Sequence, residues 1–208
     1  MKNDNSIESR RKLIELWKKE SIIKNELVVN AFLKIVREDF LPEGYKELAY
    51  SQEDIRLDDQ SIIIDSYKTI RLLVEASLST KLKVLQIGSI TGYEEALLST
   101  IGVELDVIEP RIEHIQRASA NLGTLNIIAP QYYRRLKDIS KTYDRIICFN
   151  TISSTDKRLM ELVNIGIMVL SVGEKHLLIR MVMEGNNNPI MQFKGSLWLP
   201  LIDDYIFS

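Results

Sequence analysis

The chain has 208 residues, and its 27 basic and 29 acidic side chains leave a formal net charge of −2. This balance excludes the strongly basic surface that is typical of nucleic-acid-binding proteins, so we expect no nucleic-acid partner. With 45% hydrophobic and 27% charged residues, the composition is that of an ordinary globular protein. No apolar run approaches the roughly 18 residues that can span a bilayer, and we expect a cytoplasmic protein that does not contact a membrane.

The first eighty residues predict helices joined by loops. Apolar residues recur at helical spacing after Ser6, from about Asn25 to a break before Pro42, and from Ser66 to Leu78. Three segments of other kinds lie between the last two helices: a short helical turn, a polar loop and an apolar run of undecided state, at residues 45–50, 51–59 and 61–65.

From Lys83 onward, strand patterns alternate with helical patterns, as is typical of a parallel sheet with crossover helices. The expected strands lie at 83–87, 104–108, 126–129, 144–149 and 165–172, and the expected helices at 94–101, 111–122 and 156–163. After Gly173 the pattern changes to strands at 176–183, 190–197 and 205–207, with a turn at 185–189. No helix there is long enough for a crossover, so we predict that the sheet ends in an antiparallel hairpin.

A glycine turn follows the first of these strands. Gly88 and Gly92 separate the apolar strand at 83–87 from the helical pattern that comes next. At the carboxyl end of a parallel strand, glycine backbone can approach a nucleotide and the helix amino terminus offers free N–H donors. Two glycines at this spacing also occur without any ligand, so a nucleoside site needs support from elsewhere in the chain.

An acidic residue supplies this support. Glu109 ends the next strand pattern and comes 21 residues after Gly88. Nucleoside-binding folds place at this point the carboxylate that binds the ribose hydroxyls. We therefore predict that Glu109 is a ribose ligand; the alternative is a solvated acid at a strand end, beside Pro110.

The cysteine and histidine content limits the remaining chemistry. Cys148 is the single cysteine, which excludes an intrachain disulfide and a cysteine-rich metal site. It lies in an apolar strand pattern, so we interpret it as a buried, unreactive thiol. His114 and His176 have no metal-ligand spacing; we predict a helix surface for the first and a strand end for the second, and no role for either. We predict no metal site.

Several segments, in their order along the chain, are similar to the motifs of one family. They are Val36-Arg37-Glu38-Asp39-Phe40-Leu41-Pro42-Glu43, Leu48-Ala49-Tyr50, Asp54-Ile55-Arg56-Leu57, Val84-Leu85-Gln86-Ile87-Gly88-Ser89-Ile90-Thr91-Gly92-Tyr93 and Tyr143-Asp144-Arg145-Ile146-Ile147. Together they resemble the protein-L-isoaspartate O-methyltransferases, over nearly the whole chain. The resemblance implies S-adenosylmethionine as cofactor, and as substrate a damaged protein or peptide whose stray isoaspartyl carboxylate is methylated to start its repair.

The fold class that we predict is therefore α/β: a Rossmann-like methyltransferase fold with N-terminal helices, a mostly parallel sheet and a C-terminal antiparallel hairpin. We expect one domain over 1–208, in which 1–80 form a helical extension with the substrate loop and 81–208 form the cofactor-binding core. The sequence does not indicate the oligomeric state.

The expected site residues belong to two groups. The cofactor-binding residues are Gly88, Ser89, Gly92, Tyr93 and Glu109. Ser61 is the catalytic candidate, as a hydroxyl that contacts the substrate carboxylate. The alternative for Ser61 is a loop serine satisfied by local backbone, and the alternative for Tyr93 is an aromatic ring that packs under the sheet edge.

Departures from the family pattern support other hypotheses. Gln86 stands where the family has an acid, and Ile90 replaces the middle glycine. A β-branched residue resists positive φ, and the Ile90 side chain is expected to project towards the methionine end of the cofactor. Asp65 beside an anionic substrate would repel it. One alternative is thus a catalytically inactive protein that keeps the fold for binding or structure; another is a methyltransferase that acts on a small molecule or another macromolecule.

Overall fold

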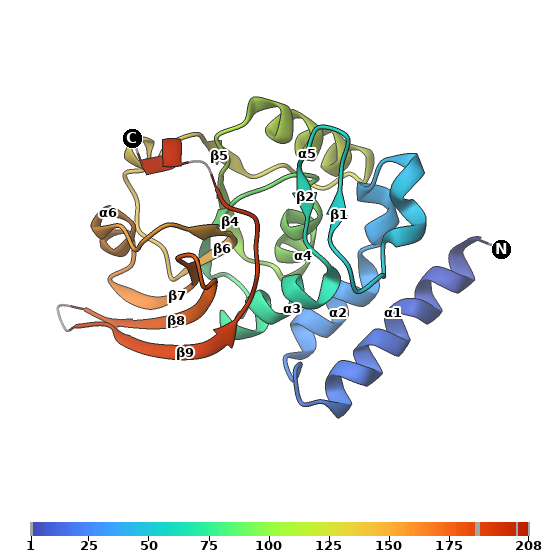
Figure 1. Cartoon of the computed structure of the whole chain (residues 1–208), viewed down its shortest axis with the longest axis horizontal. Helices are drawn as coiled ribbons and strands as arrows, with labels where there is room; N and C mark the ends of the chain where they lie inside the picture. Colours follow the sequence, from blue (N-terminus) through green and yellow to red (C-terminus); the bar gives the residue numbers. More distant parts are fainter. Residues whose placement is uncertain (1, 186–187, 203, 208) are drawn as a thin grey trace.

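The computed structural model describes residues 2–185, 188–202 and 204–207. A seven-stranded sheet forms the centre of the molecule, and a two-stranded hairpin lies apart from it. Figure 1 shows α1 and α2 on one side of the molecule and the last strands, β8 and β9, on the other. The predicted α/β class is confirmed, with N-terminal helices, a mostly parallel sheet and antiparallel strands at its end.

The elements have the following bounds. The helices are Lys2–Lys19 (α1), Glu26–Lys34 (α2), Ser66–Glu75 (α3), Tyr93–Ile101 (α4), Ile112–Thr124 (α5) and Lys157–Glu161 (α6). The short 3₁₀ helices are Arg37–Phe40 (η1), Glu43–Leu48 (η2), Leu136–Asp138 (η3) and Asp204–Phe207 (η4). The strands are Ile55–Arg56 (β1), Ile62–Ile63 (β2), Lys83–Ile87 (β3), Glu104–Ile108 (β4), Gln131–Tyr133 (β5), Arg145–Ile152 (β6), Ile165–Val172 (β7), Leu177–Glu184 (β8) and Ile190–Ser196 (β9).

The sheet order places a switch point beside β3. The strands follow the order β5-β4-β3-β6-β7-β8-β9, and only the contacts of β8 are antiparallel. The chain runs outward from β3 to β5 and then returns to β6 on the other side of β3. Ile87 pairs with Ile108 of β4 and with Cys148 of β6, so these three strands end side by side. In open α/β sheets, ligands bind outside the carboxyl ends of the strands at such a point.

Two apolar layers hold the helices on the sheet. Because side chains alternate along a strand, Val84 belongs to the cluster that includes α2, α3 and α4, whereas Leu85 and Ile87 belong to the cluster on the other face. Cys148 is fully buried in that second cluster. Burial raises the pKa of its thiol to about 12, which agrees with the prediction of an unreactive thiol. No helix of the described residues is long and apolar enough to cross a bilayer.

Four predictions of local structure are wrong. The strand expected at 126–129 lies instead at Gln131–Tyr133, after Pro130, which has no N–H to donate to a ladder. The expected strand at 205–207 is part of η4. The second helix ends at Lys34, because the next residue is already extended, and the polar loop contains β1, which pairs with β2. Residues 186–187 of the expected turn lie outside the described residues.

Candidate active site

A pocket of about 360 Å³ opens beyond the carboxyl ends of β3, β4 and β6. Its wall is formed by the loop before β2, the glycine turn, the start of α5 and the segment after β9. The lining residues are Gln60, Ser61, Ile62, Ile90, Glu109, Pro110, Arg111, His114, Asn150, His176, Trp198, Leu199, Pro200, Leu201 and Ile202. Its volume lies in the usual range of ligand pockets, and its place is that of the switch point.

The turn after β3 has the conformation that its glycines predict. Gly88 and Gly92 have φ values of +87° and +88°, in the left-handed region that glycine favours. The Gly88 N–H donates to the Ile108 carbonyl at 2.9 Å. A Cβ atom at Gly88 would lie 1.7 Å from Oδ1 of Asn150. Glycine at this position therefore allows the Asn150 side chain to lie against the turn, where it also lines the pocket.

Glu109 joins the ends of β3 and β4. The residue is 4% exposed. Its Oε2 accepts from the Ser89 N–H at 2.9 Å, and its Oε1 accepts from the Arg111 N–H at 3.0 Å. A carboxylate can accept about four hydrogen bonds. Nδ1 of His114 also lies 3.2 Å from Oε1, so Oε2 is the oxygen that keeps acceptor capacity for a hydroxyl donor in the pocket. Glu109 therefore lies in the wall of the pocket, at the end of β4 where the sequence predicts a ribose ligand.

The two departures at Gln86 and Ile90 leave the turn intact. The buried Gln86 donates from Nε2 to the Gly88 carbonyl at 2.8 Å, so a neutral side chain holds the turn. Ile90 is not among the described residues with positive φ, and the expected backbone strain is absent there. Its side chain is a shared wall of the large pocket and of a hollow of about 20 Å³ over Gly88 and Ser89. Ile90 thus narrows the space over the glycines but leaves the large pocket open.

A buried carboxyl group lies behind the turn. Glu95 of α4 is 1% exposed, and burial, followed by the nearby Glu94, raises its pKa to about 7. The side chains of Ser89 and Gln86 are close enough to lower this pKa in part. Neither oxygen of Glu95 has a well-directed hydrogen bond within the described part of the chain. The protonated form of Glu95 therefore persists to a higher pH than that of an ordinary glutamate.

Replacing Glu95 by glutamine should reduce the dependence of stability on pH. The folded-state pKa of about 7 lies above the ordinary value of 4.5, so the native state binds the extra proton and its stability is lost as pH rises through this interval. We expect the wild-type free energy of unfolding to fall by about 2 kcal/mol from pH 5 to pH 8 through this group, and Glu95→Gln to remove that fall. Urea denaturation at both pH values measures it. Glu113→Gln, on the exposed first turn of α5, is the control; an unchanged slope in Glu95→Gln would contradict the assignment.

Tyr93 occupies the core rather than the pocket wall. Its ring lies 5.6 Å from that of Phe40, and the Arg37 guanidinium lies 5.2 Å from its centroid. The side chain is 1% exposed, and the residues that line the pocket do not include it. Tyr93 thus has a packing role, which was the alternative to cofactor binding in the sequence analysis. Only its backbone is available to a cofactor.

Ser61 lies in the pocket and contacts a residue that sequence reasoning missed. Its Oγ is 2.9 Å from Nε2 of His114, so its hydroxyl is not satisfied by local backbone. His114 is 6% exposed, and the predicted helix-surface position is wrong. A signal was available: His114 comes five residues after Glu109, in the first turn of α5, where side chains tilt back towards the helix amino terminus.

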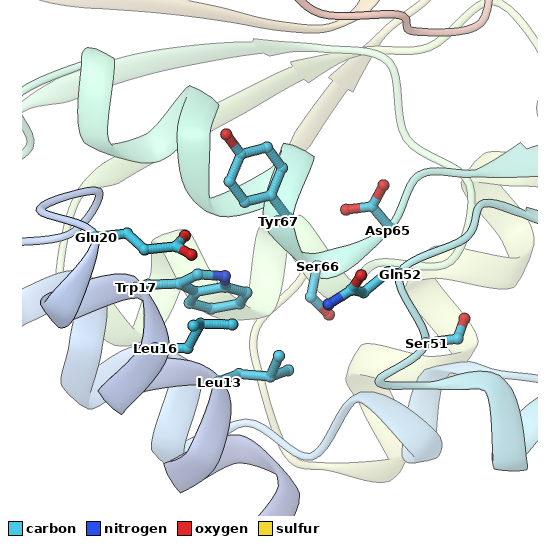
Figure 2. Close-up of a pocket in the computed structure, with 9 residues that line it drawn as sticks. All are labelled: Leu13, Leu16, Trp17, Glu20, Ser51, Gln52, Asp65, Ser66 and Tyr67. Carbon is cyan, nitrogen blue, oxygen red and sulfur yellow. The ribbon is translucent and has the colours of Figure 1, made fainter.

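His176 lies in the pocket beside Glu109, whereas Asp65 lies in another cavity. His176 directly precedes β8, as predicted, and lines the pocket, with Nδ1 2.8 Å from Oγ1 of Thr151. Asp65 caps α3, with its carboxylate accepting from the Lys68 N–H at 3.0 Å. Figure 2 shows Asp65 in a different cavity, which also contains Trp17 of α1. The expected repulsion of an anionic substrate by Asp65 therefore has no basis in the pocket beside Glu109.

The sheet order, the glycine turn and the acid after the second parallel strand define a Rossmann-like methyltransferase fold. The family model described as protein-L-isoaspartate(D-aspartate) O-methyltransferase matches residues 8–204. The chain belongs to this family.

Individual relatives agree with this assignment. The chain is 32% identical to a protein-L-isoaspartate O-methyltransferase of Dictyoglomus thermophilum, with 94% of this chain and 92% of the relative covered. A protein of the same name from Thermococcus sibiricus is 26% identical, with 93% of each chain covered. Among solved structures, a putative protein-L-isoaspartate O-methyltransferase of Plasmodium falciparum in complex with S-adenosyl-L-homocysteine has a TM-score of 0.77 at 15% identity, with 93% and 98% covered. This structural likeness supports the fold.

Proposed function

We propose that the protein is an S-adenosylmethionine-dependent methyltransferase that acts on the carboxylate of isoaspartyl residues in damaged proteins or peptides. The observation that carries this proposal is the position of Glu109, which lines the pocket beside the glycine turn while its Oε2 keeps acceptor capacity. Membership of the protein-L-isoaspartate(D-aspartate) O-methyltransferase family supports the reaction and the substrate. A cytoplasmic location stays a prediction from the sequence.

The proposed roles of the site residues follow from their places. Gly88, Ser89 and Gly92 form the turn that approaches the cofactor, and Glu109 binds its ribose. Tyr93 contributes its backbone N–H at the amino terminus of α4. Ser61 contacts the substrate carboxylate from the loop before β2.

The proposed reaction needs few catalytic groups from the protein. When bound, S-adenosylmethionine supplies a methyl group on a sulfonium leaving group. The accepting carboxylate is already ionised at neutral pH, so the protein does not need a general base. Its residues have to hold the acceptor in line and exclude water, and such positioning accounts for a large part of the catalysis of two-substrate reactions.

Two measurements test the proposal. In calorimetric titration, the purified protein is expected to bind S-adenosylmethionine, and absence of binding at millimolar cofactor would overturn the enzyme hypothesis. With radiolabelled cofactor, an isoaspartyl peptide should be methylated and the same peptide with ordinary aspartate should not. Cofactor binding without methylation of the isoaspartyl peptide would favour the inactive or the different-substrate alternative instead.

A further inference from the structure

An extended segment at 197–202 forms part of the wall of the candidate active-site pocket, and its residues alternate between buried and exposed. Leu197 and Leu199 are 7% and 0% exposed. Trp198 and Leu201 are 45% and 71% exposed, and both line the pocket. Such alternation is expected of extended backbone, in which successive side chains point to opposite sides. The segment therefore presents two large apolar side chains to whatever the pocket binds.

Backbone hydrogen bonds hold this segment in place. The Leu197 N–H donates to the His176 carbonyl at 2.9 Å. The Thr151 N–H of β6 donates to the Pro200 carbonyl at 2.8 Å, and the Ile202 N–H donates to the Thr151 carbonyl at 3.1 Å. Because the segment is bonded at its start, its middle and its end, the direction of its two exposed side chains is fixed before a ligand binds.

The indole of Trp198 is also held by side chains from other elements. Nζ of Lys68 in α3 lies 5.1 Å from the centroid of the indole, which is within the range of a cation–π interaction. The ring of His176 lies 5.8 Å from the indole. The Lys68 ammonium is itself paired with Asp54 at 2.6 Å and with Asp65 at 3.6 Å. Lys68 thus orients the indole, while its charge is already matched by two carboxylates.

The exposed side chains extend an apolar surface that other elements bring to the same pocket. Ile62 of β2 and Ile90 of the glycine turn also line it. Neighbouring exposed apolar residues mark interaction sites, and burial of apolar surface is the main favourable term in most associations. A surface that is already ordered loses little further freedom when a ligand covers it. The pocket therefore suits a ligand that carries an apolar group close to its polar one.

We propose that Trp198 and Leu201 form a substrate subsite that binds an apolar or aromatic side chain beside the isoaspartyl residue. This inference rests on the proposed function, and it narrows the substrate class to isoaspartyl sites with such a neighbour. Ser61, the proposed contact of the isoaspartyl carboxylate, lines the same pocket. Consecutive Cα atoms lie about 3.8 Å apart, so the side chain of an adjacent residue can reach the subsite while the carboxylate stays near Ser61.

The first test compares isoaspartyl peptides that differ in one position. Phenylalanine, alanine or glutamate is placed directly before or directly after the isoaspartyl residue, and methylation is measured at saturating S-adenosylmethionine. On at least one side, wild type should methylate the phenylalanine peptide with a kcat/KM about tenfold above that of the alanine peptide, because the phenyl ring is buried on binding. The difference should lie mainly in KM. The glutamate peptide should be no better than the alanine peptide.

Substitutions in the segment assign this preference to the subsite. Trp198→Ala should reduce the ratio between the phenylalanine and alanine peptides to about twofold or less. Leu201→Ala should reduce it in part, and Trp198→Phe, which keeps an aromatic ring, should retain most of it. Phe193→Ala is the matched control, since Phe193 of β9 is 66% exposed and is not among the described residues that line the pocket; it should keep the tenfold ratio. Because both peptides are compared on the same variant, a general loss of activity does not alter the result.

The second test follows peptide binding without turnover. The chain has two tryptophans, and Trp17 is 3% exposed and lines a different cavity. In protein saturated with S-adenosylhomocysteine, the phenylalanine peptide should cover Trp198. Tryptophan emission should then shift to shorter wavelength, and acrylamide should quench it less. Trp198→Phe should show neither change.

The outcomes separate this inference from the proposed function. Equal kcat/KM for the phenylalanine and alanine peptides in wild type, or a preference that survives in Trp198→Ala, overturns the subsite and leaves the enzyme assignment standing. A preference for the glutamate peptide also overturns an apolar subsite. Failure to methylate any of the isoaspartyl peptides overturns the proposed function, and this inference with it.

Discussion

Replacing Glu109 by alanine is expected to weaken the binding of S-adenosylmethionine about a hundredfold. The substitution removes the carboxylate that lines the pocket and leaves the N–H groups of Ser89 and Arg111 without their acceptor. Hydrogen bonds to a charged group contribute about 1.5–3 kcal/mol each, and a loss of about 3 kcal/mol corresponds to this factor. Calorimetric titration measures the dissociation constant.

Two further variants show whether the lost charge of Glu109 causes the weaker binding of S-adenosylmethionine. Glu109→Gln keeps the shape and one acceptor, so it should lose less affinity than the alanine variant. Glu104→Gln changes an exposed carboxylate at the other end of the same strand and should bind the cofactor as wild type does. A change of less than about threefold in Glu109→Ala would remove Glu109 from the cofactor site.

Gly92→Ala should lower the free energy of unfolding by about 3 kcal/mol. The backbone at Gly92 has a φ of +88°, and a Cβ atom there would lie 2.9 Å from the Ala118 carbonyl oxygen and 3.3 Å from Cγ of Leu122. A left-handed conformation costs a residue with a Cβ about 1–2 kcal/mol, and overpacking against α5 adds about 1–3 kcal/mol. Urea denaturation monitored by circular dichroism gives the change.

Gly123→Ala is the matched control for this substitution. Gly123 lies in α5, and no described atom outside its chain neighbours and the nearby backbone of that helix lies within 4 Å of the Cβ that alanine would add. Because alanine is the better helix former, this variant should be more stable than wild type, by up to about 1 kcal/mol. Equal stability of the two alanine variants would show that α4 and α5 are not held together closely at Gly92.

The sequence predicted best the strands that are followed directly by a glycine or an acidic residue. β3 ends at a glycine turn, β4 ends at an acid, and both were predicted to the residue. The strand expected at 126–129 was misplaced, and Ile128 within that range is 92% exposed. At the sheet edge an apolar side chain need not face the core, so local composition does not fix the strand there. The prediction of one domain over the whole chain remains a prediction.

In the site, too, features set by residues close in sequence could be predicted, and contacts between residues far apart in sequence could not. The place of Glu109 beside the glycine turn could be predicted, because its spacing from Gly88 is set by one strand–helix–strand unit. The contact of Ser61 with His114 could not, because it joins residues 53 positions apart. This contact depends on how the loop before β2 packs against α5. The hydrophobic periodicity of either segment does not predict that packing. The same holds for Tyr93, since its partners Phe40 and Arg37 come from η1.

The closeness of Gln86 to the buried Glu95 has a consequence for substitutions at either position. Glu95 belongs to α4, behind the turn, and Gln86 of β3 lies close enough to affect its pKa. Gln86→Glu alone would bring a second carboxyl group into a buried space that already disfavours one charge. Gln86→Glu should therefore destabilise the protein when made alone, and less so when Glu95→Gln removes the neighbouring carboxyl group.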